Sequence, residues 1–204
     1  MPGSVVDLSA LGAKVPSPIV VDTNLIVEWL VVPMLGVAPS SPTVAGTQHA
    51  SQFFSELSAS RGTGIVTPTV FTELVHVAIE FRYKQELSRI NAMARQGNGP
   101  RIKSWRRLYK QDASILQAFQ GDLQRLRSLL VASGLLFLEQ SGLGPIPSGR
   151  EYDEELVHLV GTYGLDSNDA AILMEARRSG VTAIVSLDAD MRRARADFDI
   201  YTWL

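Results

Sequence analysis

The chain has 204 residues, of which 46% are apolar and 20% charged, and its formal net charge is −2. These values are typical of one globular domain with a sizeable core, and no apolar run is long enough to span a membrane. The sequence contains no cysteine, which excludes disulfides, zinc–thiolate sites and thiol catalysis, and no signal-peptide pattern, so a cytoplasmic location is expected. With three histidines in all, a metal site would rely mainly on oxygen ligands, which favours Mg²⁺, Mn²⁺ or Ca²⁺ over Zn²⁺.

Short apolar runs alternate with amphipathic segments along the chain. Residues 1–17 show no periodicity and are predicted to form a flexible N-terminal tail, followed by a single domain over 18–204. Strands are predicted at 18–22, 64–67, 135–138, 182–186 and 198–203. Helices are predicted at 25–30, 47–59, 68–93, 101–118, 120–132, 151–163, 168–179 and 189–196. This alternation predicts an α/β fold, a three-layer α/β/α sandwich around a mostly parallel sheet.

Four acids fall where a parallel sheet can bring them together. Asp22 ends the first predicted strand, and Asp188 lies two residues beyond the fourth. Glu73 lies near the start of the helix after the second strand, and Asp169 opens another helix. Ligands bind at the carboxyl ends of parallel strands, so all four acids can converge on one rim. Clustered carboxylates repel one another unless cations neutralise them, and a hard divalent cation there could activate water against a phosphate.

Each acid also has an ordinary structural explanation. Asp22 could belong to a post-strand turn, and Glu73 could complement a helix N-terminus. Asp166 and Asp169 fit an N-cap followed by an acid three residues later, and Asp188 could cap a short helix. Asp22 is the hardest to explain in this way, because an acid that ends a buried strand must be paired or solvated.

Four segments, in this order along the chain, resemble the motifs of PIN-domain nucleases. They are Ile19–Asn24, Phe71–Leu74, Gly164–Leu173 and Val185–Met191. The resemblance covers most of the chain except a predicted helical insertion at about 96–145, and it implies a five-stranded sheet. It also implies a site in which Mg²⁺ or Mn²⁺ is held by Asp22, Glu73, Asp169 and Asp188, with Asp190 as a further ligand and Asn24 and Ser186 as supporting residues. Whether Asp166 joins the site or only caps its helix stays open.

The family resemblance also implies a function. PIN-domain nucleases hydrolyse phosphodiester bonds, commonly in RNA, and leave a 5′-phosphate and a 3′-hydroxyl. Many bacterial members are dimeric toxins of the VapC type, silenced by an antitoxin whose tail enters the acidic groove. An endoribonuclease with an RNA substrate, a possible antitoxin and a homodimer is therefore expected.

Basic charge is concentrated in one segment. Between Phe81 and Lys110 there are nine basic residues and one acid, a local formal charge of +8. Residues 101–110 mix cations with two aromatic residues, Trp105 and Tyr109, which suits phosphate contacts and base stacking with single-stranded RNA. The candidate RNA-binding residues are Arg101, Lys103, Trp105, Arg106, Arg107 and Lys110. The alternative is a solvated helix face, with Trp105, Leu108 and Tyr109 as its packed stripe.

Two other functions fit parts of the sequence. Glu73-x-x-His76 and Glu155-x-x-His158 are two copies of a pattern used by di-iron carboxylate helical bundles, although that fold leaves the apolar strands unexplained. The other is a PIN-like protein that binds RNA or a partner without cleaving it. The complete set of four acids argues against this second alternative.

Overall fold

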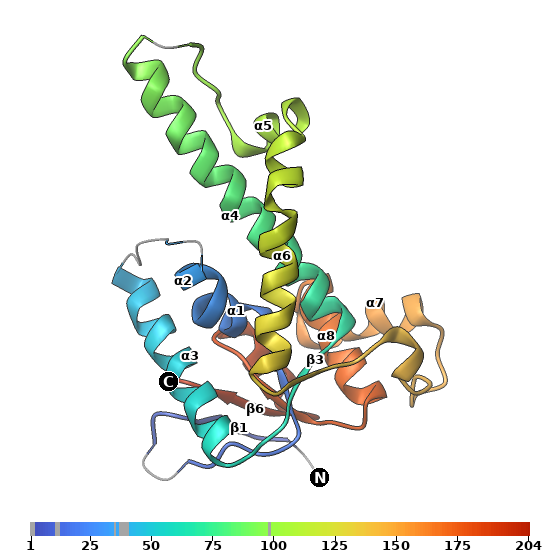
Figure 1. Ribbon diagram of the computed structural model, residues 1–204. Coiled ribbons are helices and arrows are strands. Elements are labelled where there is room, and N and C mark those ends of the chain that lie inside the picture. Colours follow the sequence, from blue (N-terminus) through green and yellow to red (C-terminus); the bar gives the residue numbers. More distant parts are fainter. Residues whose placement is uncertain (1–2, 11–12, 35, 37–40, 98) are drawn as a thin grey trace.

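Six strands form one fully parallel sheet in the computed structural model, which describes the chain except residues 1–2, 11–12, 35, 37–40 and 98 (Figure 1). The strands are β1 (Val5–Asp7), β2 (Ile19–Val21), β3 (Gly64–Val66), β4 (Leu135–Phe137), β5 (Ala183–Val185) and β6 (Asp199–Thr202). Their order in the sheet is β1-β6-β5-β2-β3-β4, and every pairing is parallel. The expected α/β fold with a parallel sheet is confirmed.

Strand β1 was not expected. The sequence predicted a flexible tail over 1–17 and five strands, whereas Val5–Asp7 pairs in parallel with β6 as the sixth strand. Backbone hydrogen bonds extend this pairing, from Ile200 N–H to the Ser4 carbonyl and from Leu8 N–H to the Thr202 carbonyl, each 2.7 Å long. The sequence could not predict this strand, because three half-buried residues at a sheet edge show no periodic pattern. Its pairing partner β6 also lies almost at the other end of the chain.

Helices lie on both sides of the sheet, as in a three-layer sandwich. They are α1 (Thr23–Ile26), the π-helical turn η1 (Val27–Val31), α2 (Val32–Met34), α3 (Ser41–Ala59), α4 (Pro68–Arg95), α5 (Trp105–Gln111), α6 (Ser114–Ala132), α7 (Tyr152–Tyr163) and α8 (Ser167–Arg178), with 3-10 turns η2 (Gln140–Gly142) and η3 (Asp190–Ala194). Helix α8 packs against α4 and α7, and α3 packs against α1. Within the described ranges, no helix is both long and apolar enough to cross a membrane.

The helical insertion projects from the body as an arm, which we define as residues 81–122 (Figure 1). Tyr83 and Leu108 are buried in the arm outside the main hydrophobic core, whereas the buried Phe119 belongs to the main core. The Tyr83 hydroxyl donates a hydrogen bond of 2.9 Å to the Asp112 carbonyl, and the Asn91 side chain both donates to and accepts from the Ile102 backbone. Two helices were expected at 101–118 and 120–132, but the break between α5 and α6 lies near residue 112. Beyond the arm, the region expected as insertion also contributes β4 to the sheet.

The sheet reverses its order between β2 and β5. From β2 the chain adds β3 and β4 on one side, and β5 and β6 later fill the other side. In the register of this central pair Val21 lies opposite Val185, so the residues that follow, Asp22 and Ser186, emerge side by side. Crevices at such reversal points are where open parallel sheets bind their ligands.

Candidate active site

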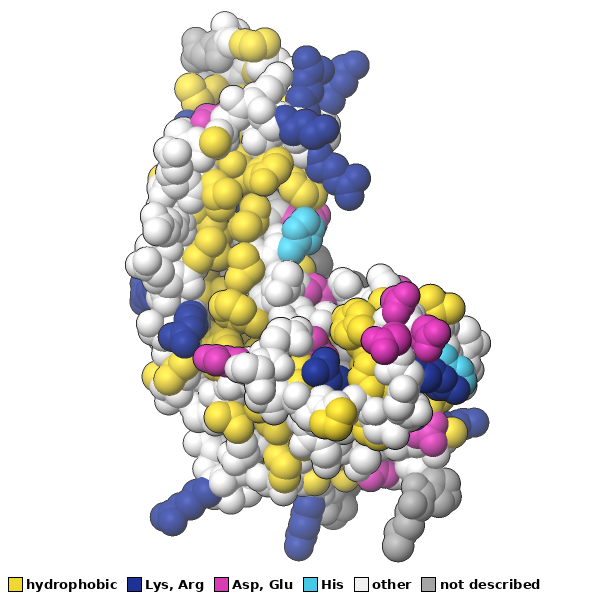
Figure 2. All heavy atoms as spheres, turned by 90° about the vertical axis from the view of Figure 1, so that its right-hand side faces the viewer, with side chains coloured by type: hydrophobic (Ala, Val, Ile, Leu, Met, Phe, Trp, Pro, Cys, Tyr) yellow, Lys and Arg dark blue, Asp and Glu magenta, His cyan; other side chains and the backbone are white. Residues whose placement is uncertain are grey.

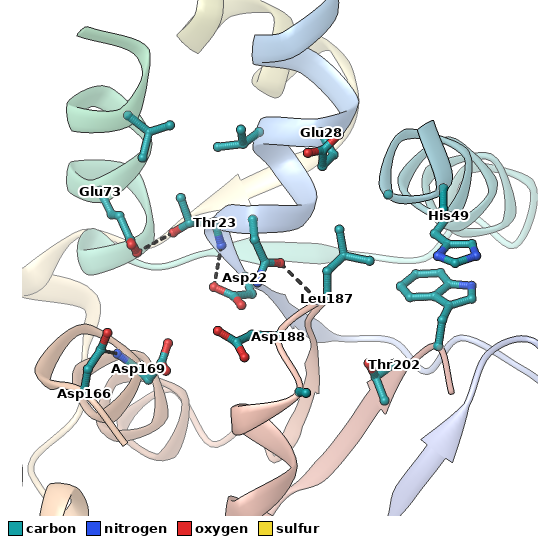
Figure 3. A pocket seen from close by; sticks show the side chains of 17 residues that line it. Asp22, Thr23, Glu28, His49, Glu73, Asp166, Asp169, Leu187, Asp188 and Thr202 are labelled. Atoms are coloured by element: carbon teal, nitrogen blue, oxygen red, sulfur yellow. Dashed lines mark hydrogen bonds between the residues drawn. The ribbon is translucent and has the colours of Figure 1, made fainter. Parts of the chain in front are cut away.

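A cavity of about 780 Å³ opens at the carboxyl ends of β2 and β5. All four acids expected from the sequence line it, each contributed by a different segment of the chain. In Figure 3, Asp22 and Asp188 lie next to one another, with Glu73 and Asp169 on the neighbouring helices. The sequence therefore predicted correctly that Asp22, Glu73, Asp169 and Asp188 come together.

Asp22 is the most buried of these acids, with 3% of its surface exposed. Its Oδ1 accepts a hydrogen bond of 2.6 Å from the Thr23 N–H, so it caps α1. Its Oδ2 accepts a bond of 2.5 Å from the Ser186 hydroxyl. The side chain is therefore held in one orientation by groups that donate to the ionised carboxylate.

Ser186 and Asn24 tie the ends of the two central strands together. The Ser186 Oγ accepts bonds from the Asp188 N–H at 2.8 Å and from Nδ2 of Asn24 at 3.2 Å. Asn24 in turn accepts a bond of 3.1 Å at Oδ1 from the Leu187 N–H. Both residues thus have the supporting position that was expected for them, since they hold Asp22 and Asp188 in place.

Glu73 is positioned by a residue that the sequence analysis left out of the site. The Thr23 hydroxyl donates a hydrogen bond of 2.8 Å to Oε2 of Glu73, which joins α1 to α4 across the cavity. Helix α4 starts at Pro68 with Thr67 as its N-cap, so Glu73 falls in the second turn, on the cavity side. Thr23 stands in the Asp22–Asn24 motif, but the motif alone assigned it no role.

The sequence left open whether Asp166 joins the acidic site or only caps its helix. The Asp166 Oδ1 accepts bonds of 2.9 Å from the N–H groups of Asn168 and Asp169, so Asp166 is the N-cap of α8. Asp169 lies half-buried in the first turn of α8, and its carboxylate has no hydrogen-bond partner among the residues that the structure describes. Both residues line the cavity, Asp166 at its margin in Figure 3.

Asp188 lies closer to the site than Asp190. The Asp188 Oδ1 accepts a bond of 2.8 Å from the Asp190 N–H, which fixes the turn before η3. The Asp190 carboxylate is exposed, pairs with Arg193 at 2.8 Å, and is not among the residues that line the cavity. Asp190 therefore supports Asp188 through its backbone, rather than as the further ligand that was expected.

The electrostatics of the site are those of crowded carboxylates. Burial raises the pKa of Asp22 to about 6, an effect opposed by hydrogen bonds from Ser186 and Thr23 and increased by the charges of Glu73 and Asp188. Burial likewise raises the pKa of Asp169 to about 7, with repulsion from Asp22 and the other nearby acids adding to it. In the described part of the chain, none of the four acids forms an ion pair with lysine or arginine.

The donor set fits a hard divalent cation. Carboxylate and hydroxyl oxygens line the acidic end of the cavity, which suits Mg²⁺ or Mn²⁺. Among the residues that the structure places, no three acidic or histidine side chains are grouped tightly enough to hold one ion on their own. Mg²⁺ does not need such a group, because it commonly keeps several waters and uses one or two carboxylates together with substrate phosphates.

The far end of the cavity is aromatic. His49 of α3 and Trp203 stack with ring centroids 4.9 Å apart and planes 4° from parallel. Glu28 also lines this end, and its Oε2 accepts a bond of 2.9 Å from Thr47. No sequence signal points to this wall, because its members come from segments with no shared motif.

The two Glu-x-x-His patterns do not form one site. Glu155 is buried and bonded to Arg150 and Arg177, at 2.9 and 3.2 Å, which lower its pKa against the effect of burial. His158 is exposed on α7, whereas Glu73 lies at the acidic cavity. The two ion pairs of Glu155 and the parallel sheet both argue against a di-iron bundle.

The candidate RNA-binding residues are on the arm. The five cations Arg101, Lys103, Arg106, Arg107 and Lys110 are exposed, and in the described residues none is paired with an acid. Trp105 is half-buried and edge-on to His76 at 6.3 Å, and Leu108 is buried, so part of the expected packed stripe is present. Figure 2 shows a hollowed face between arm and body, with lysine and arginine side chains gathered toward the end of the arm.

Comparison of the chain with protein-family models and with curated proteins finds no match. The PIN-domain resemblance therefore stays a prediction that rests on the four motifs.

Proposed function

We propose that this chain is a metal-dependent nuclease that hydrolyses phosphodiester bonds in RNA, with Mg²⁺ or Mn²⁺ as its cofactor. The observation that carries the proposal is the convergence of Asp22, Glu73, Asp169 and Asp188 on one cavity, with no lysine or arginine of the described chain paired to them. Bringing four carboxylates together costs folding free energy through their mutual repulsion unless a bound cation neutralises them. Nuclease sites commonly use clustered carboxylates to hold such a cation.

The bound cation would supply a Lewis acid that lowers the pKa of water and neutralises charge on the phosphate. The protein's own groups position and tune the ligands. Ser186 and Thr23 fix Asp22 and Glu73 through hydrogen bonds, and the Asp190 N–H fixes Asp188. The raised pKa of Asp169 makes its carboxyl a candidate to exchange a proton near neutral pH when the cation is absent.

RNA is the substrate that the surface supports best. Arg101, Lys103 and Lys110 are among exposed, unpaired cations on the described part of the arm, and their segment reaches the body through the contact of Trp105 with His76. Cations beside an aromatic side chain favour a flexible single strand. By the family resemblance, cleavage leaves a 5′-phosphate and a 3′-hydroxyl.

The resemblance extends the proposal to partners. A VapC-like endoribonuclease toxin in the cytoplasm would form a homodimer and be silenced by an antitoxin whose tail enters the acidic cavity. The cavity, about 780 Å³ in volume, has room for the side chains of such a tail, and a basic side chain there would neutralise the four acids.

The proposal is tested with RNA cleavage and metal binding measured on the same preparations. Wild type is expected to cleave structured or single-stranded RNAs with Mg²⁺ or Mn²⁺ and to lose this activity in EDTA. Asp188→Asn is expected to lose it with either metal, whereas Asp122→Asn, an exposed acid on α6, keeps it. Equal cleavage by Asp188→Asn would overturn the mechanism.

Calorimetry with Mn²⁺ separates a nuclease from a protein that only binds RNA. Wild type is expected to bind Mn²⁺ and Asp22→Asn to bind it far more weakly, with a thermal melt showing that the variant is folded. Absence of Mn²⁺ binding by wild type would favour the non-catalytic alternative.

A further inference from the structure

His49 of α3 lines the same cavity as the four acids, at its far end. Its ring stacks on Trp203 with the two planes 4° from parallel, which fixes the orientation of the imidazole. In the part of the chain that the structure describes, neither ring nitrogen of His49 has a hydrogen-bond partner. The residue is only half-buried, so a molecule that occupies the cavity can reach these nitrogens (Figure 3).

Other polar side chains of the cavity lining already use their hydrogens. The Thr23 hydroxyl donates to Glu73, and Nδ2 of Asn24 donates to Ser186. Lysine and arginine are absent from the described residues that line the cavity. An imidazole carries at least one N–H in either protonation state, so His49 offers a free donor at the far end whether or not it is charged.

The far end suits an uncharged polar group better than a phosphate or a base. Glu28 also lines it, and among the described residues its carboxylate forms no ion pair. A phosphate placed there, away from the cation, would be repelled by this carboxylate and by the four acids. A base needs the face of an aromatic ring for stacking, whereas Figure 3 shows the His49 ring with its edge toward the cavity.

A ribose hydroxyl meets these conditions and lies close to the proposed cation site. Each backbone phosphate is bonded directly to two riboses, so a phosphate held at the acids brings a 2′-hydroxyl into the same cavity. The volume of about 780 Å³ has room for both groups. The 2′-hydroxyl is uncharged, both donates and accepts, and is the group by which a protein can distinguish RNA from DNA.

We propose that His49 donates a hydrogen bond to the 2′-hydroxyl of a ribose next to the scissile phosphate, and so makes the protein prefer RNA to DNA. This inference rests on the proposed function, which assigns no residue to the choice between the two nucleic acids. It makes His49 a specificity-determining residue at the end of the cavity opposite the acids.

The experiment replaces each ribose of a single-stranded RNA hexamer in turn by 2′-deoxyribose and measures kcat/KM with Mg²⁺. In wild type, one position next to the cut is expected to lose about fivefold, the effect of one hydrogen bond to a neutral group. His49→Phe keeps a ring that can stack on Trp203 but has no N–H. In this variant the same deoxyribose should cost less than about twofold. His158→Ala, an exposed histidine on α7 outside the cavity, should respond like wild type.

Two results would overturn the ribose contact while leaving the nuclease proposal intact. One is cleavage by wild type that is insensitive to deoxyribose at every position. The other is a deoxyribose effect of the same size in His49→Phe as in wild type. His49→Ala repeats the test without any ring at this position, and a thermal melt of each variant shows that it is folded.

A binding measurement keeps the two proposals separable. Fluorescence anisotropy of the same labelled hexamers, with Ca²⁺ in place of Mg²⁺, needs no cleavage. If one deoxyribose weakens binding to wild type but not to His49→Phe, while no metal-dependent cleavage is found, the ribose contact stands and the nuclease proposal fails.

Discussion

The Ser186 hydroxyl donates a hydrogen bond of 2.5 Å to Oδ2 of Asp22 and so joins the ends of the two central strands. The same oxygen accepts from the Asp188 N–H at 2.8 Å, so one hydroxyl orients two of the four acids. Its place in the register, opposite Asp22 in the β2–β5 pair, follows directly from the parallel pairing.

Ser186→Ala is expected to weaken Mn²⁺ binding and RNA cleavage by roughly 10- to 100-fold, because both acids lose their orienting partner. Loss of the hydrogen bond also raises the pKa of Asp22 further, since this bond lowers it. The measurements are Mn²⁺ calorimetry and cleavage rate as a function of pH. Ser128→Ala, on the exposed side of α6, is the matched control. A Ser186→Ala protein with wild-type affinity and pH profile would refute the positioning role.

Asp169→Asn should stabilise the metal-free protein while weakening its metal binding. The folded-state pKa of Asp169 is raised to about 7 from an ordinary value of 3.8. The folded protein thus holds this proton more tightly than the unfolded chain, and the resulting stability is full below about pH 4 and lost as pH rises to 7. Asp169→Asn has no titrating group at this position and does not lose stability in this way. Its free energy of unfolding relative to wild type therefore increases between pH 4 and 7 and then levels off.

Because the Asp169 carboxylate is partly solvated, we expect the advantage at pH 8 to be about 1 kcal/mol, or 2–4 °C in Tm. Thermal melts of both proteins in EDTA at pH 5 and pH 8 measure it. Mg²⁺ added at pH 8 should raise the Tm of wild type more than that of the variant. A difference in Tm that shrinks as pH rises would contradict the assigned repulsion.

Thr23→Val tests the contact across the cavity between α1 and α4. The change keeps the shape of the side chain but removes the 2.8 Å bond to Glu73. We expect a loss of about 1 kcal/mol in metal-dependent activity, roughly fivefold, because Glu73 can still reach the site by rotation. Thr182→Val, an exposed threonine before β5, is the control for the substitution itself. Equal activity of the two variants would show that Glu73 needs no such support.

The acidic site could be predicted because its main signal is local. A strand buried on both faces is a continuous apolar run. Burying Asp22 at the end of such a strand costs free energy unless its carboxylate has a hydrogen-bond partner or a ligand. Asp188 follows an equally clear strand. The parallel arrangement then places both at one edge, and the helix periodicity places Glu73 and Asp169 beside them. Nothing beyond strand ends, helix starts and the order of motifs was needed.

The remaining features depend on contacts between distant segments. Strand β1 is three residues long and forms only by pairing with β6. The division between α5 and α6 arises where the Asp112 side chain accepts from the N–H and hydroxyl of Ser114, a short-range turn within a run that otherwise looks helical. The aromatic wall of the active-site cavity, in which His49 stacks on Trp203, likewise joins segments that share no sequence pattern.

Neutralising the arm tests whether its cations bind phosphate. A triple variant, Arg101→Gln, Lys103→Gln and Lys110→Gln, is expected to weaken RNA binding and to flatten the dependence of log K on log salt by about 0.7 for each phosphate of a single strand that the variant no longer neutralises. The control removes the same charge elsewhere, with Lys14→Gln, Arg125→Gln and Arg195→Gln, all at exposed positions. Anisotropy titrations of single-stranded RNA from about 50 to 300 mM salt compare them. If both triple variants flatten the slope equally, binding follows net charge alone, and the arm has no special part in holding RNA.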